Sequence, residues 1–149
     1  MVRIKTILVP VDFSDHSGRA LEYAVDLAKQ FGATVHLLHS YPINLGGVSP
    51  YGVVLPESFE RDCREAASTQ LDEWVSRVKS AGVTAESTVT PMFPSEAIAQ
   101  RADEIGADLI VMGTRGLTGL KHVLLGSVAE RTLRVAPCPV LTVKDAASE

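Results

Sequence analysis

The sequence near the C-terminus contains Asp108-Leu-Ile-Val-Met-Gly113-Thr-Arg-Gly116-Leu-Thr-Gly119, followed by Gly126-Ser127-Val-Ala-Glu130. The apolar run Leu109–Met112 is typical of a buried strand, and the glycines that come directly after it are typical of a turn. Ser127 can cap a helix that continues to about Val135, because Pro137 prevents its extension. This stretch therefore predicts a strand, a glycine-rich turn and a helix in succession.

The turn and the helix start that follows it both suit a bound anion. Gly113 can adopt a positive φ or let a ligand lie against bare backbone, and the first N–H groups of the helix at Ser127 attract negative charge. Together they predict a phosphate-binding site. A structural alternative stays open, in which the glycines only form a turn and Ser127 with Glu130 forms a capping box, Ser-x-x-Glu. A phosphate would compete with Glu130 for the same N–H donors.

The rest of the chain alternates short apolar runs with segments of helical periodicity. The expected strands are residues 5–11, 34–40, 83–90, 109–112 and 140–143, and the expected helices are residues 15–31, 57–80, 94–105 and 128–135. Ser14 can cap the first helix and Gly32 ends it. This alternation predicts an α/β fold with an open, mostly parallel sheet, covered by helices on both faces and connected by right-handed crossovers.

Apolar residues at helical spacing predict which face of each helix points inward. The residues expected to face the core are Leu21, Ala24, Val25, Ala28 and Phe31 in the first helix, Phe59, Cys63, Ala67, Leu71, Trp74 and Val78 in the second, and Ile98, Ala102 and Ile105 in the third. The long segment 41–56 is rich in glycine and proline, and we interpret it either as a lid over a ligand or as a simple loop.

Composition limits the possible functions. A chain of 149 residues, 46% hydrophobic and 21% charged, is expected to fold as one domain, residues 1–149. The net charge of −4 and the scattered Lys and Arg argue against a nucleic-acid partner, and no apolar run reaches the roughly 20 residues of a membrane span. Cys63 and Cys138 have neither metal-site spacing nor a disulfide framework, and His36 and His39 fall on opposite faces of a strand. We therefore expect a cytoplasmic protein.

Ligands of such sheets bind beyond the carboxyl ends of the strands, where the strand order changes direction. The first strand ends at Pro10-Val11-Asp12 and the fourth at Met112-Gly113. If these strands are neighbours, a carboxylate and a glycine turn share one crevice. The Asp12 carboxylate could accept from an exocyclic amine or a ribose hydroxyl, help to hold a metal, or serve only as a turn or cap residue.

The other residues near this crevice complete the outline of a nucleotide site. Met112 is apolar and adaptable enough to pack against a flat base. The backbones of Gly113 and Gly116, the side chain of Arg115 and the helix start at Ser127 would hold phosphates.

These motifs resemble those of the universal stress protein family. The spacing Gly113-x2-Gly116-x9-Gly126-Ser127 is similar to the family's nucleotide-binding signature. The segments Leu8-Val9-Pro10-Val11-Asp12-Phe13-Ser14 and Ala136-Pro-Cys-Pro-Val140-Leu-Thr-Val143 also resemble the family, so that the likeness spans essentially the whole chain. It implies five strands in the order 3-2-1-4-5 and a homodimer paired through the last strand, Val140–Val143. An edge strand with unpaired backbone groups is physically suited to such pairing.

Because the glycine signature is intact, the resemblance is to the ATP-binding members, with Mg²⁺ or Mn²⁺ accompanying the nucleotide. It implies that Pro10, Val11 and Asp12 contact adenine and ribose and that Ser40 lies beside the base. The residues implied for the turn are Met112, Gly113, Arg115 and Gly116, and those for the phosphates and ribose are Gly126, Ser127, Val128 and Ala129. Related proteins can carry a hydroxyl at the position of Ala129, where this chain offers only its N–H.

Catalytic motifs are absent from the sequence. It contains no Gly-x4-Gly-Lys-Ser/Thr loop, no Gly-x-Gly-x-x-Gly after the first strand, and no evident residue that would orient an attacking water. The expected function is therefore a nucleotide-dependent sensor or regulator in the stress response. Two alternatives stay open. One is a slow, metal-dependent ATP hydrolase or phosphotransferase, and the other is a dimeric interaction module that does not use nucleotide.

Overall fold

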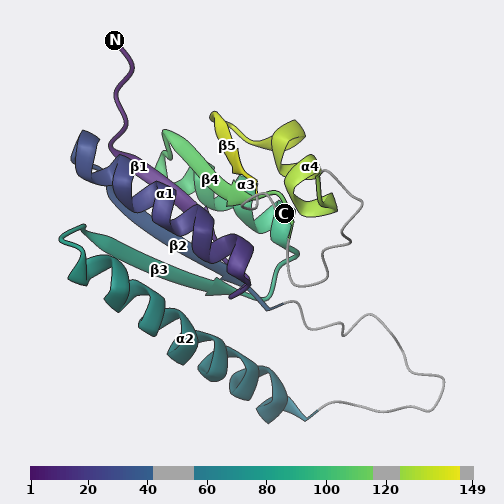
Figure 1. Ribbon diagram of the computed structural model, residues 1–149. Helices are drawn as coiled ribbons and strands as arrows, with labels where there is room; N and C mark the ends of the chain where they lie inside the picture. Colours follow the sequence, from purple (N-terminus) through teal and green to yellow (C-terminus); the bar gives the residue numbers. More distant parts are fainter. Residues whose placement is uncertain (42–55, 116–124, 145–149) are drawn as a thin grey trace, which may run out of the picture.

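The structure is a computed structural model that describes residues 1–41, 56–115 and 125–144. Strands and helices alternate along these residues (Figure 1). The strands are β1 (Thr6–Pro10), β2 (Thr34–Ser40), β3 (Ala85–Thr90), β4 (Leu109–Gly113) and β5 (Val140–Val143). The helices are α1 (Asp15–Phe31), α2 (Glu57–Ser80), α3 (Pro94–Ile105) and α4 (Ser127–Val135). Each predicted element is present, with bounds that differ from the prediction by no more than one or two residues at an end.

The strands form one five-stranded parallel sheet in the order β3-β2-β1-β4-β5, which confirms the predicted fold class and strand order. Strand β1 is central, because Ile7 pairs with Val35 of β2 on one side and with Leu109 of β4 on the other. The strand order therefore changes direction between β1 and β4. Since all the strands are parallel, their carboxyl ends share one side of the sheet, which we call the carboxyl edge.

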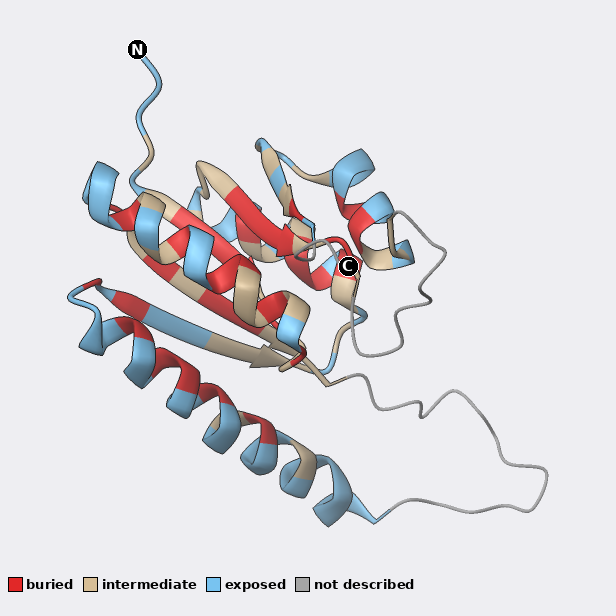
Figure 2. Ribbon diagram, in the orientation of Figure 1, coloured by how far each residue is buried: buried red, intermediate tan, exposed pale blue. Residues whose placement is uncertain are grey.

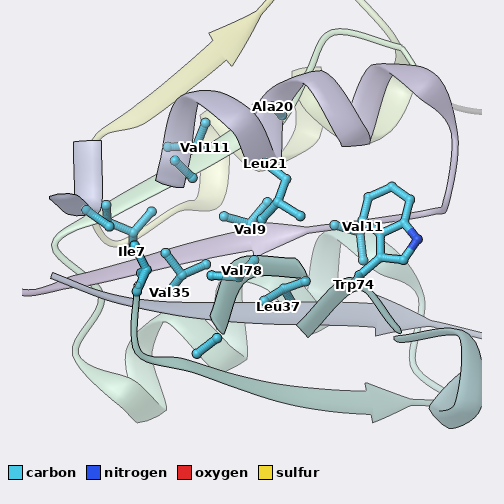
Figure 3. Close-up of a cluster of buried hydrophobic side chains, with 14 of the residues drawn as sticks. Ile7, Val9, Val11, Ala20, Leu21, Val35, Leu37, Trp74, Val78 and Val111 are labelled. Carbon is cyan, nitrogen blue, oxygen red and sulfur yellow. The ribbon is translucent and has the colours of Figure 1, made fainter. Parts of the chain in front are cut away.

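Helices cover both faces of the sheet, with α1 and α2 on one face and α3 and α4 on the other (Figures 1 and 2). Successive residues of β1 point to opposite faces, so that Ile7 and Val9 belong to the core under α1 and α2, and Leu8 to the core under α3 and α4. Figure 3 shows the first of these cores, in which Trp74 and Val11 lie at the same end. The carboxyl end of β1 is therefore fixed by packing on both faces.

Three residues predicted to face the core do not lie within it. Phe31 is 48% exposed and Phe59 41% exposed, and Cys63 is only partly buried. Phe59 and Cys63 belong to the first turns of α2, whose buried residues begin at Ala67 (Figure 2). Phe31 is the last residue of α1, beside Gly32, where the chain turns toward β2. Helical periodicity predicts the direction of a face, but not how far the sheet extends beneath it.

His36 of β2 carries the clearest pH-sensitive interaction on the α3 side of the sheet. Its Nδ1 lies 3.3 Å from Oε2 of Glu86, its register partner on β3. Burial lowers the pKa of His36 below its ordinary value of 6.5, Glu86 partly opposes this shift, and Arg101 of α3 adds to it. The folded protein therefore protonates His36 at lower pH than the unfolded chain does.

We expect this histidine to make the protein less stable as the pH falls below 6.5, because the unfolded chain then binds the proton more readily. The measurement is the free energy of urea unfolding at pH 7.5 and at pH values below 6.5. His36→Gln should flatten this dependence, and Glu86→Gln should steepen it, since Glu86 raises the pKa of His36. Equal pH dependence in the parent and in His36→Gln would contradict the assignment.

Candidate functional site

The carboxyl edge brings the ends of β1, β2 and β4 together. Backbone pairing continues just past the strands, since the N–H of Val11 donates to the carbonyl of Leu38 at 2.8 Å and that of Thr114 to the carbonyl of Val143 at 3.2 Å. The apolar side chains here are well packed, with Val11 4% and Met112 5% exposed. The strand ends at this edge are therefore held by backbone pairing and by closely packed apolar side chains.

Gly113, at the end of β4, lies against another element of the fold. Its φ is not positive, so the first of the two interpretations offered for this glycine, a positive φ, is wrong. A Cβ at this position would lie 3.1 Å from both the Cβ and the carbonyl oxygen of His16 in α1. The missing side chain therefore allows the first turn of α1 to approach β4. Within the described residues, what lies against Gly113 is this helix.

Gly126 brings the start of α4 against the end of β4. Its N–H donates to the carbonyl of Thr114 at 2.6 Å, and a Cβ on Gly126 would lie 3.0 Å from that same oxygen. The strand end and the helix start that the sequence predicts to form a phosphate-binding site are thus adjacent, although they are separated by residues 116–124, which lie outside the described part of the chain.

The helix cap at this point differs from the prediction. The N-cap of α4 is Gly126, with no side-chain cap hydrogen bond, and Ser127 is the first helical residue. The predicted capping by Ser127 and the capping box with Glu130 are therefore wrong. The Glu130 carboxylate instead accepts from Arg134 at 2.6 Å. Gly126 supplies no side chain to cap the first N–H groups of α4, and these groups with the helix dipole are suited to hold an anion.

Asp12 lies in a tightly hydrogen-bonded turn between β1 and α1. Its Oδ1 accepts from the N–H of Ser14 at 3.0 Å, from the hydroxyl of Ser14, and from the hydroxyl of Ser17 at 3.0 Å. Ser14 caps α1, as predicted, by accepting from the N–H of Ser17. The interpretation of Asp12 as a turn residue is thus confirmed, and these hydrogen bonds also orient its carboxylate at the carboxyl edge.

Phe13 gives this turn an unusual backbone. Its φ is 65°, a conformation that costs a residue with a large side chain roughly 1–3 kcal/mol. The ring packs 4.4 Å from the ring of His39 and 5.5 Å from that of Trp74, between ring centres, and Nδ1 of His39 lies 2.8 Å from the carbonyl oxygen of Val11. Packing against these two rings therefore holds the residue beside Asp12 in place. These contacts place His39 on the opposite face from His36, as predicted.

The structure brings most of the predicted residues to one region. Pro10 ends β1, and Val11 and Asp12 follow it. Ser40 ends β2, and Met112 and Gly113 end β4, with Arg115 two residues further on. Gly126 caps α4, and the helix starts with Ser127, Val128 and Ala129. Ala129 is buried in the core under α3 and α4. Gly116 and nearly all of the segment 41–56 lie outside the described residues.

Sequence reasoning missed Ser17 as part of this site. It is 5% exposed and contacts both the backbone and the carboxylate of Asp12. The spacing Asp12-x-Ser14-x-x-Ser17 carries the signal, because a residue three positions after a helix cap lies over that cap.

A groove of 1160 Å³ lies between α1 and α2, and its lining reaches the carboxyl edge only at Phe13 and the first residues of α1. Its lining mixes both charges, with Arg19 and Glu22 on α1 and Glu73 and Arg77 on α2. It is a separate feature from the region between β1, β4 and α4. No group of three His, Cys, Asp or Glu side chains in residues 1–41, 56–115 and 125–144 could hold a metal, and no helix there is long and apolar enough to cross a membrane.

Known proteins are similar to this chain in sequence and in fold. The model of the Universal stress protein family matches residues 3–144. Universal stress protein MJ0531 of Methanocaldococcus jannaschii is 39% identical over 144 residues, which cover 94% of this chain and 82% of that protein. The solved structure of MJ0577, from the same organism, has a TM-score of 0.86 and 29% identity, with 99% of this chain and 100% of that one covered.

Similar structures also include nucleotide complexes. The universal stress protein of Archaeoglobus fulgidus in complex with dAMP has a TM-score of 0.67 and 26% identity, with 97% of this chain and 100% of that one covered. The strand order changes direction between β1 and β4, and the carboxyl ends of these strands meet there. These two features define a doubly wound α/β protein. The chain belongs to the universal stress protein family.

Proposed function

We propose that this protein binds an adenine nucleotide, ATP in particular, at the carboxyl edge between β1 and β4, and acts as a nucleotide-dependent regulator in the stress response. The observation that carries the proposal is the pairing of two features across this edge. The carboxylate of Asp12 is oriented by three hydrogen bonds, and the start of α4 lies against the end of β4 with a glycine as its N-cap, which supplies no side-chain cap.

The chemistry of the edge suggests how the nucleotide lies. We assign the contacts with adenine to the strand-end residues Pro10, Val11 and Met112, and Asp12 accepts from the adenine amine or from a ribose hydroxyl. The N–H groups at the start of α4, from Ser127 onward, hold phosphate oxygens. We also assign Arg115 to the contacts with phosphate, and Gly116 by its place in the sequence signature. The dAMP complex of the A. fulgidus relative supports an adenine nucleotide as the ligand class.

A divalent cation would accompany ATP chiefly through the phosphates. Mg²⁺ prefers oxygen ligands and usually keeps several waters, so that one protein carboxylate with substrate phosphates is enough to bind it. Asp12 is a carboxylate at this edge, and it would fill this role only in place of its contact with the amine or the ribose hydroxyl. Bound Mg²⁺ would neutralise phosphate charge, and the protein's own groups would fix the position of the nucleotide.

Calorimetric titration of nucleotide-stripped protein with ATP, AMP and adenosine, each with and without Mg²⁺, tests this proposal. We expect ATP to bind more tightly than AMP, and AMP more tightly than adenosine, because each phosphate adds charge at the start of α4. Absence of binding by all three in correctly folded protein would overturn the proposal, and would favour an interaction module that does not use nucleotide.

We further propose that the protein forms a homodimer through β5. This strand is last in the sheet order, so one side of its backbone has no partner strand within the described chain, and Leu141 on it is 38% exposed. Leu133 and Val135 of α4, which packs beside β5, are 46% and 51% exposed. A second copy of β5 would pair with this backbone and cover these side chains.

Leu141→Lys is expected to convert the dimer to monomer, because the charge would enter the apolar centre of the paired strands. Sedimentation equilibrium measures the change in mass. Tyr23→Lys, at an exposed aromatic residue on α1, is the matched control and should leave the dimer intact. A parent protein that sediments as a monomer at micromolar concentration would contradict the proposed interface.

A further inference from the structure

Ser17 lies in the first turn of α1 and contacts Asp12 at two points. Its hydroxyl donates to Oδ1 of Asp12 at 3.0 Å, and the same oxygen of Ser17 accepts from the backbone N–H of Asp12 at 3.3 Å. With 5% exposure, this side chain is almost closed off from solvent. One buried hydroxyl therefore bonds to both the backbone and the carboxylate of Asp12, which lies at the carboxyl edge.

Formation of α1 does not require this hydroxyl. Ser14 already caps the helix through its own side chain, which accepts from the N–H of Ser17. A serine inside a helix ordinarily bonds back to a carbonyl, and the Ser17 hydroxyl does lie 3.1 Å from the carbonyl oxygen of Ser14. The hydroxyl has only one proton, however, and a carboxylate is the stronger acceptor, which favours the bond to Asp12.

The contact between Ser17 and Asp12 lies beside a residue with a strained backbone, Phe13. Phe13 has a φ of 65°, which a large side chain adopts only when surrounding contacts hold it there. On one side, the rings of His39 and Trp74 hold Phe13. On the other side, Ser17 and Ser14 hold Asp12. Removal of the Ser17 hydroxyl would take away one of the hydrogen bonds that orient the Asp12 carboxylate, while Ser14 keeps the helix capped.

We propose that Ser17 is a positioning residue of the nucleotide site, which raises ATP affinity by holding Asp12 in the orientation that the nucleotide requires. This inference rests on the proposed function and adds to it a residue that does not itself touch the nucleotide. It follows that Ser17 affects ATP affinity only by orienting Asp12, and that this effect requires the Asp12 carboxylate.

A double-mutant cycle on ATP affinity tests this dependence, with Ser17→Ala, Asp12→Ala and the double variant titrated calorimetrically below their melting temperatures. We expect Ser17→Ala to weaken ATP binding about tenfold in the parent, and less than about twofold in the Asp12→Ala background. Ser17→Thr, which keeps the hydroxyl, should restore affinity to within about threefold of the parent. Ser17→Cys, a weaker donor of similar shape, supplies the comparison if Ser17→Ala does not fold.

The matched control is Ser95→Ala, which removes a buried hydroxyl from the first turn of α3 on the other face of the sheet. It should leave ATP affinity unchanged. If the parent binds ATP and Ser17→Ala has no effect, or has an equal effect with and without Asp12, the positioning role is overturned while the proposed function stands. If the folded parent binds no adenine nucleotide, both are overturned.

Discussion

Gly113→Val is expected to lower the free energy of unfolding by about 3 kcal/mol, although this glycine lies where the nucleotide signature begins. The added Cβ would lie 3.1 Å from the Cβ and the carbonyl oxygen of His16, so that the first turn of α1 would have to move away from β4. Urea unfolding followed by circular dichroism measures the effect. Loss of ATP binding in this variant would therefore reflect a displaced helix as well as any lost contact with the ligand.

Gly18→Ala is the matched control for this prediction. Gly18 lies within α1, and a Cβ there would be 3.6 Å from the ring of Trp74, an ordinary van der Waals contact. Alanine is favoured over glycine in a helix, and this variant should be more stable than the parent by roughly 0.5–1 kcal/mol. A Gly113→Val protein as stable as the parent would show that α1 does not depend on the close approach seen in the structure.

Ser127→Asp is expected to weaken ATP binding by about tenfold or more, while leaving the protein as stable as the parent or slightly more so. Ser127 is exposed at the first position of α4, where a negative charge interacts favourably with the helix dipole. The same charge would repel the phosphates proposed to bind there. Weaker ATP binding in a variant that is at least as stable as the parent would show that the loss of affinity does not come from a folding defect.

Ser127→Asn is the neutral control, with a side chain of nearly the same shape. It should bind ATP within a few-fold of the parent, and adenosine should bind the parent and both variants alike because it has no phosphate. Equal ATP affinity in Ser127→Asp and Ser127→Asn would place the phosphates away from the start of α4. It would thereby contradict the arrangement proposed for the site.

Much of the fold could be predicted because its signals are local. The apolar run at Leu109–Met112, the cap at Ser14 and the glycine that ends α1 each fix an element from neighbouring residues alone. Strand order came from the resemblance to a known family, since the pairing of β1 with β4 joins segments about a hundred residues apart. The structure confirms both kinds of prediction.

Parts of the site could not be predicted because they depend on contacts between distant segments. Gly113 is explained by His16, which lies on another element, and the capping position of α4 is fixed at Gly126 by its hydrogen bond to Thr114. A local pattern placed that cap at Ser127, one residue too late. The positive φ of Phe13 has no local signal either, since it is held by the rings of His39 and Trp74.

The location of the nucleotide is tested most directly by a titration of ¹⁵N-labelled protein with ATP, followed through the chemical shifts of its backbone amides. We predict the largest shifts at Asp12 and at Ser127 and Val128, because base and phosphates would lie against these two ends of the carboxyl edge. Amides in the groove between α1 and α2, such as that of Glu73, should change little. Shifts centred on that groove, or none at the start of α4, would contradict the account.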